Sequence, residues 1–268
     1  MKIRSFHHPD LSLPVVRRRV GEEVQHLLCG YMDLLRTRGK SATWQSTFPS
    51  PDAYYAAVYR LRRAGLLAKT DSRHRPKITL TSQAYATLPE LFRPDKAWKK
   101  RWSGIWYVVL YDVPQTDAAY RQALRTFLKR MRMGCFQKSV WITPKDIRPM
   151  YDDLVRAAGI RDYAILFEAR TVLGQPAREL VHQAWDMDTL REGQRWYCQV
   201  FGDNIERIRS GNVSRPRLER FAREEMSAYV TVMDKDPLLP GALLPPNYLG
   251  REVYRLHKRV LKAVADAL

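Results

Sequence analysis

A continuous apolar run extends from Ile105 to Leu110 and reads IWYVVL. It is short, rich in aromatic and β-branched residues, and lies between Gly104 and the sequence Asp-Val-Pro. These features are typical of a strand that is buried on both faces. Asp112 follows directly after this predicted strand, at a position that suits either a functional side chain or a cap of the next helix.

The segments after this strand alternate between helical and extended patterns. Residues 116–133 repeat apolar side chains with the period of a helix, and residues 134–144 and 163–168 are predicted as strands. A second helix fits residues 146–158. This order predicts a small α+β sandwich of ferredoxin-like type, in which one strand is not recognisable from the sequence. The residues that the first of these helices is expected to bury are Ala123, Leu124, Phe127, Leu128 and Met131.

Three helical patterns precede the sandwich. Apolar residues from Val20 to Leu35 recur at helical spacing, and Ser41 can cap a short second helix that ends at Trp44. Ser50 and the proline after it begin a third helix over residues 52–64. This helix leads into the basic turn TDSRHRPK and the strand pattern ITLT. Three helices followed by a two-stranded wing form the plan of a winged helix-turn-helix domain.

One face of the third helix is unusual for a solvated surface, because it carries Tyr55, Tyr59, Arg62 and Arg63. These side chains suit a DNA major groove. Arginine reads guanine edges or binds phosphates, and tyrosine contacts the backbone and thymine methyl groups. An ordinary solvated face is the alternative interpretation.

The other predicted DNA contacts flank this helix. Side chains at the entry of the helix-turn-helix would contact the DNA backbone, and basic side chains of the wing would reach phosphates or the adjacent minor groove. In chain order these residues are Ser41, Thr43, Trp44 and Gln45, followed by Arg73, Arg75 and Lys77.

The C-terminal third is predicted as helices around an apolar loop. Helical patterns cover residues 177–208, 216–233 and 252–267, and Trp196 and Tyr197 are both expected to face inward. The loop DPLLPGALLPPNYLG has to pack against other elements, so the region is predicted as a folded domain. Large aromatic residues are usually core, but the candidates for lining a pocket for an aromatic ligand are Trp141, Trp185 and Trp196.

The net charge of +18 is distributed unevenly. Residues 1–103 contain 20 Lys and Arg against 8 Asp and Glu, whereas residues 104–268 contain 26 against 20. A first third this basic indicates a polyanionic partner. Nucleic acid is favoured over an acidic membrane, because no amphipathic basic helix of membrane type occurs.

Other chemistry has weaker signals. Cys29, Cys135 and Cys198 lie far apart and fit neither a disulfide framework nor a zinc site. The histidines lack metal-binding spacing, and no nucleotide fingerprint occurs, so no cofactor is expected. The first twenty residues lack a signal-peptide pattern, and no apolar run is long enough to span a bilayer. We expect a cytoplasmic, nucleoid-associated bacterial protein with no membrane partner.

Three phrases of the sequence together resemble the PaaX-like transcriptional repressors, named for the repressor of phenylacetic acid degradation. They are AVYRLRRAGLL, WYVVLYDVP with FQKSVWITP, and AWDMDTL with DPLLPGALLPPNYLG, in the family's order over nearly the whole chain. The resemblance implies an N-terminal winged helix, a central ferredoxin-like domain and a C-terminal helical domain. It also implies a homodimer that binds a palindromic operator in double-stranded DNA. A small effector, an acyl-CoA of the aryl-CoA type in the named case, would release it.

The central domain also resembles the small CRISPR adaptation nuclease, whose dimer holds a metal between two aspartates. Asp112 matches that aspartate. Either two copies of Asp112 bind a divalent cation that activates water toward a phosphodiester, or Asp112 caps the next helix or ties the strand end and the domain only dimerises. The second interpretation is favoured, because one carboxylate per subunit supplies few of the oxygen ligands that Mg²⁺ takes.

The sequence therefore predicts an α+β multidomain protein. The predicted function is a sequence-specific DNA-binding transcriptional regulator, a homodimeric repressor and not an enzyme. The alternatives are a metal-dependent nuclease that uses Asp112 and a DNA-binding adaptor without an effector. The predicted segments are a basic arm at 1–19, a winged-helix DNA-binding domain at 20–90, a linker at 91–101, a ferredoxin-like dimerisation domain at 102–172 and a helical domain at 173–268.

Overall fold

The computed structural model describes residues 90, 93–152, 164–170, 174–211 and 213–267, together with parts of the segment 52–80. The basic arm and the first two predicted helices lie outside the described residues. From Pro94 onward, the chain forms two compact units. The sheet unit comprises Pro94–Gly193 and Asp234–Leu249, and the helical unit comprises Gln194–Met233 and Gly250–Leu268. The region predicted as one C-terminal domain is thus divided between the two units.

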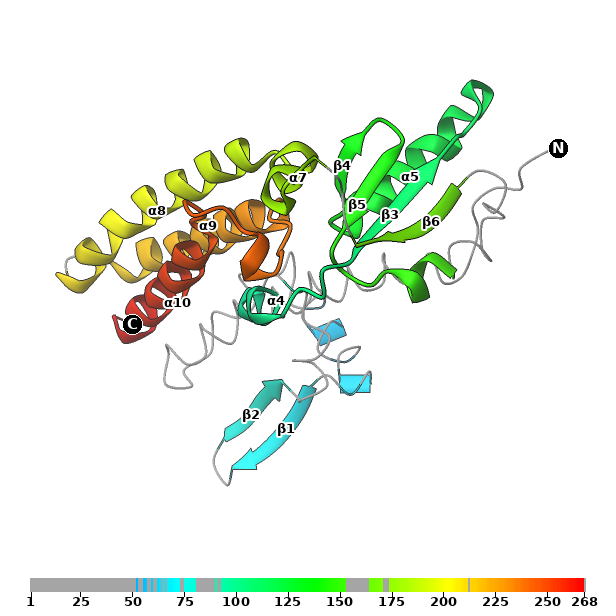
Figure 1. The fold of residues 1–268 in the computed structure, drawn as a ribbon. Coiled ribbons are helices and arrows are strands. Elements are labelled where there is room, and N and C mark those ends of the chain that lie inside the picture. The colour runs from blue at the N-terminus through cyan, green and yellow to red at the C-terminus, as the bar shows by residue number, and fades with distance from the viewer. Residues whose placement is uncertain are drawn as a thin grey trace. The chain divides into compact units, whose positions relative to one another are not determined.

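The sheet unit contains a four-stranded antiparallel sheet with the strand order β4-β5-β3-β6 (Figure 1). The predicted buried strand is β3, and it lies inside the sheet between β5 and β6. An antiparallel sheet with packed helices agrees with the predicted α+β class. The strands are β3 (Trp106–Tyr111), β4 (Gly134–Gln137), β5 (Val140–Thr143) and β6 (Ala164–Ala169).

The strand that sequence analysis could not recognise lies inside residues 134–144. This segment was predicted as one strand, and that prediction is wrong, because β4 and β5 pair with each other as an antiparallel hairpin. The turn between them consists of Lys138 and Ser139. Neither residue is a glycine, proline or asparagine, so the usual sequence signal of a hairpin turn is missing.

Helix α5 (Ala118–Arg130) supplies the core on one face of the sheet. It follows β3 through the short 3₁₀ helix η4 (Gln115–Asp117). Leu124 and Leu128 are both 0% exposed and belong to the same core cluster as Val109 of β3. Full burial of one leucine side chain contributes about 1.5–3 kcal/mol, so this helical face holds α5 on the sheet.

Three further segments complete the sheet unit. Helix α4 (Pro94–Lys99) occurs in the stretch expected as a linker and buries Trp98, whose ring packs edge-on against Tyr248 at 5.9 Å between centroids. Helix α7 (Ala177–Ala184) lies against β4. The apolar loop contains the 3₁₀ helix η6 (Gly241–Leu243) and packs as predicted, because Leu238, Leu239, Leu243 and Leu244 are buried.

The helical unit is built from three helices that lie side by side: α8 (Met187–Arg209) from Gln194 onward, α9 (Arg215–Asp234) up to Met233, and α10 (Gly250–Asp266) (Figure 1). Tyr197 is 0% exposed, as predicted, but Trp196 is 51% exposed and does not face inward. Adjacent helical residues point in different directions, and Tyr197 occupies the core position.

A buried polar cluster joins these three helices. Glu225 of α9 is 0% exposed and accepts a hydrogen bond from the hydroxyl of Tyr197 on α8. The Nδ1 atom of His257 on α10 lies 2.8 Å from the same carboxylate, and its ring stacks on Tyr229 at 3.8 Å between centroids. Burial and the neighbouring Glu225 carboxylate raise the pKa of Tyr197, so its hydroxyl remains a donor. Glu225 therefore stands at the centre of a buried cluster that joins the three helices.

Replacement of Gly134 by alanine should destabilise the protein. A Cβ atom at this position would lie 2.7 Å from the Cβ of Ala184 and 2.7 Å from atoms of the Trp185 ring. Such overpacking costs about 1–3 kcal/mol, which urea unfolding would measure. Gly202→Ala in α8 is the matched control: nothing lies within 4 Å of the position that its Cβ atom would take, and alanine favours a helix by roughly 0.5–1 kcal/mol. Equal effects of the two substitutions would contradict the close packing.

Candidate functional site

The described part of the predicted third helix presents one exposed face. The positions with helical backbone there are Asp52, Tyr55, Ala56, Tyr59, Arg62 and Arg63, and all of them are exposed. Their spacing of three and four residues places them on the same side of a helix. Tyr55 is 61% exposed and Tyr59 is 65% exposed. The face therefore exposes two tyrosine and two arginine side chains.

A glycine ends this helix at the predicted place. Gly65 has a φ angle of 70°, in the left-handed region that glycine adopts without steric cost. Its backbone N–H donates to the carbonyl oxygen of Arg62 at 3.0 Å. Such a turn is a common helix C-terminus, and it directs the chain into the segment that was predicted as the wing.

The predicted wing is an antiparallel hairpin. Strand β1 (Leu67–Ser72) pairs with β2 (Arg75–Leu80), from Leu67 opposite Leu80 to Ser72 opposite Arg75. Two of the predicted wing contacts, Arg75 and Lys77, are residues of β2, which begins earlier than the sequence indicated. The other predicted contacts lie outside the described residues: Ser41, Thr43, Trp44, Gln45 and Arg73.

Asp112 is exposed and follows β3 directly. The turn after β3 is held by Arg121, whose guanidinium donates to the carbonyl oxygens of Val113 at 3.1 Å and Pro114 at 3.0 Å. The N-cap positions of η4 and α5 are Pro114 and Asp117. Asp112 is therefore not the cap of the next helix, which was one of the two structural roles expected for it. Within the described ranges, no group of three or more acidic, histidine or cysteine residues could hold a metal ion.

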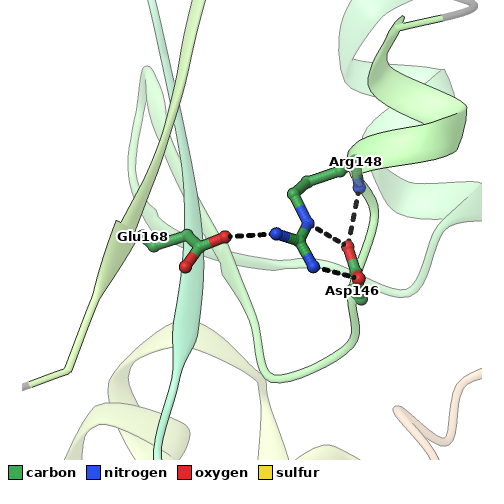
Figure 2. Close-up of polar contacts among 3 residues, drawn as sticks. All are labelled: Asp146, Arg148 and Glu168. Carbon is green, nitrogen blue, oxygen red and sulfur yellow. Dashed lines mark hydrogen bonds and ion pairs between the residues drawn. The ribbon is translucent and has the colours of Figure 1, made fainter.

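A charged cluster that the sequence did not reveal connects the loop after β5 to β6 (Figure 2). The guanidinium of Arg148 donates to both carboxylate oxygens of Asp146, at 3.0 Å and 2.7 Å, and lies 3.0 Å from Glu168 on β6. It also lies over the ring of Tyr107, 5.6 Å from the centroid. Arg148 holds the pKa of Asp146 below its usual value. Asp146 and Arg148 are two residues apart, but the contact with Glu168 depends on the sheet and has no local signal.

The central region matches a known family. The sequence model described as PaaX protein central Cas2-like domain covers residues 99–181, which include the four-stranded sheet and α5. This match confirms the resemblance to the PaaX-like family, and the chain is PaaX-like in its central domain.

A solved structure is similar to this chain in fold. It is an uncharacterized protein from Mycobacterium tuberculosis with 22% sequence identity and a TM-score of 0.50, and the match covers 84% of this chain and 86% of that one. At this identity the likeness concerns the fold alone. The sequence matches no curated protein significantly. No described helix is both long and apolar enough to cross a membrane.

The cluster of Asp146 with Arg148 predicts a pH-dependent contribution to stability. The pKa of Asp146 is lower in the folded state than in the unfolded state. The pair therefore stabilises the fold above the unfolded pKa of about 4, and this contribution is lost as the pH falls through the lower, folded pKa. Asp146→Asn should reduce stability at pH 7 and have less effect at acidic pH, measured by urea unfolding at both. The effect is small because both side chains are partly exposed.

Asp203→Asn on α8 is the matched control, since Asp203 is an exposed aspartate outside this cluster. At pH 7 it should reduce stability less than Asp146→Asn does. A loss in Asp146→Asn that is the same at neutral and acidic pH would contradict the assigned pairing with Arg148.

Proposed function

We propose that this PaaX-like chain is a sequence-specific DNA-binding transcriptional regulator that acts as a homodimeric repressor in the cytoplasm. The observation that carries the proposal is the exposed face of Tyr55, Tyr59, Arg62 and Arg63, followed directly by the hairpin of β1 and β2. An α-helix fits into the major groove of DNA, and a hairpin next to it can reach the adjacent DNA backbone. The match to the PaaX central domain supports the class of regulator.

The charge distribution supports a nucleic-acid partner for the same region. Residues 1–103 carry a charge excess of 20 Lys and Arg over 8 Asp and Glu. Phosphate contacts supply much of the affinity of DNA-binding proteins, and base contacts supply their specificity. The two tyrosines and two arginines provide groups for both kinds of contact. The basic residues Arg73, Arg75 and Lys77 would add phosphate contacts from the wing.

An apolar patch on the central sheet supports the homodimer. Leu110 of β3 is 41% exposed, and Ile165 and Phe167 of β6 are 60% and 45% exposed. Ile165 lies opposite Leu110 and Phe167 lies opposite Val108, so these side chains share the sheet face that α5 does not cover. A contiguous exposed apolar patch is typical of an interaction site. A two-fold dimer would present two winged helices to a palindromic operator.

Release from DNA by a small effector is the remaining part of the proposal. An effector with different affinities for the DNA-bound and the DNA-free protein would change the affinity for the operator. The factor is the ratio of these two affinities. An acyl-CoA is the effector class that the family resemblance implies. A chain that binds its operator and responds to no small molecule would instead be the adaptor described above.

Arg62→Ala tests the recognition face. If Arg62 contacts a base, its loss should cost about 1–3 kcal/mol of binding to the native promoter and should reduce the preference for this DNA over random DNA. Fluorescence anisotropy with both DNAs measures the two quantities. Arg207→Ala removes an exposed arginine of α8 and should leave both unchanged. Wild-type promoter affinity in Arg62→Ala would show that the recognition face is wrongly assigned.

Asp112→Asn separates the regulator from the nuclease. This substitution retains the size of the side chain and removes the charge that would bind a divalent cation. A regulator should keep its DNA affinity after this change, and neither the wild type nor the variant should cleave DNA with Mg²⁺ or Mn²⁺. Cleavage by the wild type that disappears in Asp112→Asn would favour the nuclease instead.

A further inference from the structure

A pocket of about 400 Å³ lies within the sheet unit. Its apolar wall includes Met133, Trp185, Leu190 and Pro237, and the ammonium-bearing side chains Lys129 and Lys235 line the same pocket. Small-molecule sites are typically concave, mostly apolar and oriented by a few polar groups, with volumes from about 300 Å³ upward. The pocket therefore has the size and the lining of a site for a small ligand. Of the three tryptophans proposed from sequence, Trp185 lines it, whereas Trp141 is core and Trp196 is exposed.

The acidic groups of the pocket have partners inside the protein. The Asp186 carboxylate accepts the backbone N–H of Thr189 at 3.1 Å. Hydrogen bonds from the side chain and the backbone of Thr189 hold the pKa of Asp186 below its usual value. Asp234 forms an ion pair with Arg132 at 3.8 Å. Asp236 is fully buried and accepts the backbone N–H of Leu238 at 2.8 Å. All three carboxylates therefore form contacts within the wall of the pocket.

Arg132 also has partners within the wall of the pocket. It adopts a left-handed backbone with a φ angle of 58°. Its guanidinium donates to the carbonyl oxygens of Asp234, at 2.9 Å, and Asp236. By contrast, Lys129 and Lys235 have no ion pair with any residue in the described part of the chain. They are the cationic groups that remain available to a ligand.

We propose that this pocket binds a compact organic anion. Its apolar body would lie against Met133, Trp185 and Leu190, and its carboxylate would receive charge-assisted hydrogen bonds from Lys129 and Lys235. A DNA phosphate fits this lining less well, because the DNA backbone has no apolar group that could pack against the apolar wall of the pocket. A cationic ligand is disfavoured, because the carboxylates already have internal partners.

The position of the pocket gives ligand binding a structural consequence. Its wall contains Met187, Thr189 and Leu190 from the first turn of α8, Asp234 at the end of α9, and the three residues that follow α9. Both helices continue into the helical unit along the chain. A bound anion would therefore contact the start of α8 and the end of α9. Regulation of DNA binding through this pocket rests on the proposed function, but binding of the anion does not.

The test is isothermal titration of the full chain with benzoate, in the absence of DNA. Benzoate combines an aromatic body with one carboxylate; benzamide has nearly the same shape without the charge, and inorganic phosphate has charge without the apolar body. We expect saturable binding of benzoate and much weaker binding of the other two. The double variant Lys129→Ala/Lys235→Ala should bind benzoate roughly tenfold more weakly.

A second double variant, Lys138→Ala/Lys262→Ala, removes the same charge from exposed lysines that do not line the pocket and should bind benzoate as the wild type does. Four results would overturn the proposal. These are the absence of saturable benzoate binding, equal binding of benzamide, equal binding of phosphate, or the same loss of affinity in both double variants. Because no DNA is present, each result is independent of whether the chain binds an operator.

Discussion

The close contact of Gly134 with Ala184 and Trp185 determines how the sheet unit is assembled. The contact is possible only because residue 134 has no side chain. It brings the first residue of β4 against the junction of α7 and α8, where the indole Nε1 of Trp185 donates to the carbonyl oxygen of Arg132 at 3.2 Å. Arg132 in turn holds the backbone at the end of α9 and two residues beyond it. Segments that are about fifty and one hundred residues apart along the chain thus form one wall.

The same wall explains why the apolar loop is part of the sheet unit. Asp236 stands at the start of this loop and is 0% exposed, and the hydroxyl of Tyr248 donates to its carboxylate. Burial raises the pKa of Asp236, and the hydrogen bonds oppose that shift. A buried carboxylate is costly without donors, so these contacts specify one conformation for the loop. Glu225 has the corresponding role in the helical unit, where it joins α8, α9 and α10 through Tyr197 and His257.

Local patterns predicted the elements with strong periodicity. Strand β3, the core residues Leu124 and Leu128, and the last two helices follow the apolar spacing of the sequence. The hairpin of β4 and β5 was missed because its turn lacks the usual residues. The ion pair of Arg148 with Glu168 and the pocket around Trp185 depend on long-range contacts, which no local pattern encodes. For the DNA interface, helical spacing predicted that Tyr55, Tyr59, Arg62 and Arg63 share one face of a helix. Their contacts with DNA remain a prediction.

Site-specific DNA binding is tested most directly by fluorescence anisotropy with DNA from the chain's own promoter, measured over a series of salt concentrations and against random DNA. A site-specific regulator should bind the promoter tightly at physiological salt and prefer it clearly over random DNA. Equal affinity for both DNAs, falling steeply as salt increases, would show that charge alone drives the binding. That result would contradict the proposed sequence-specific regulator.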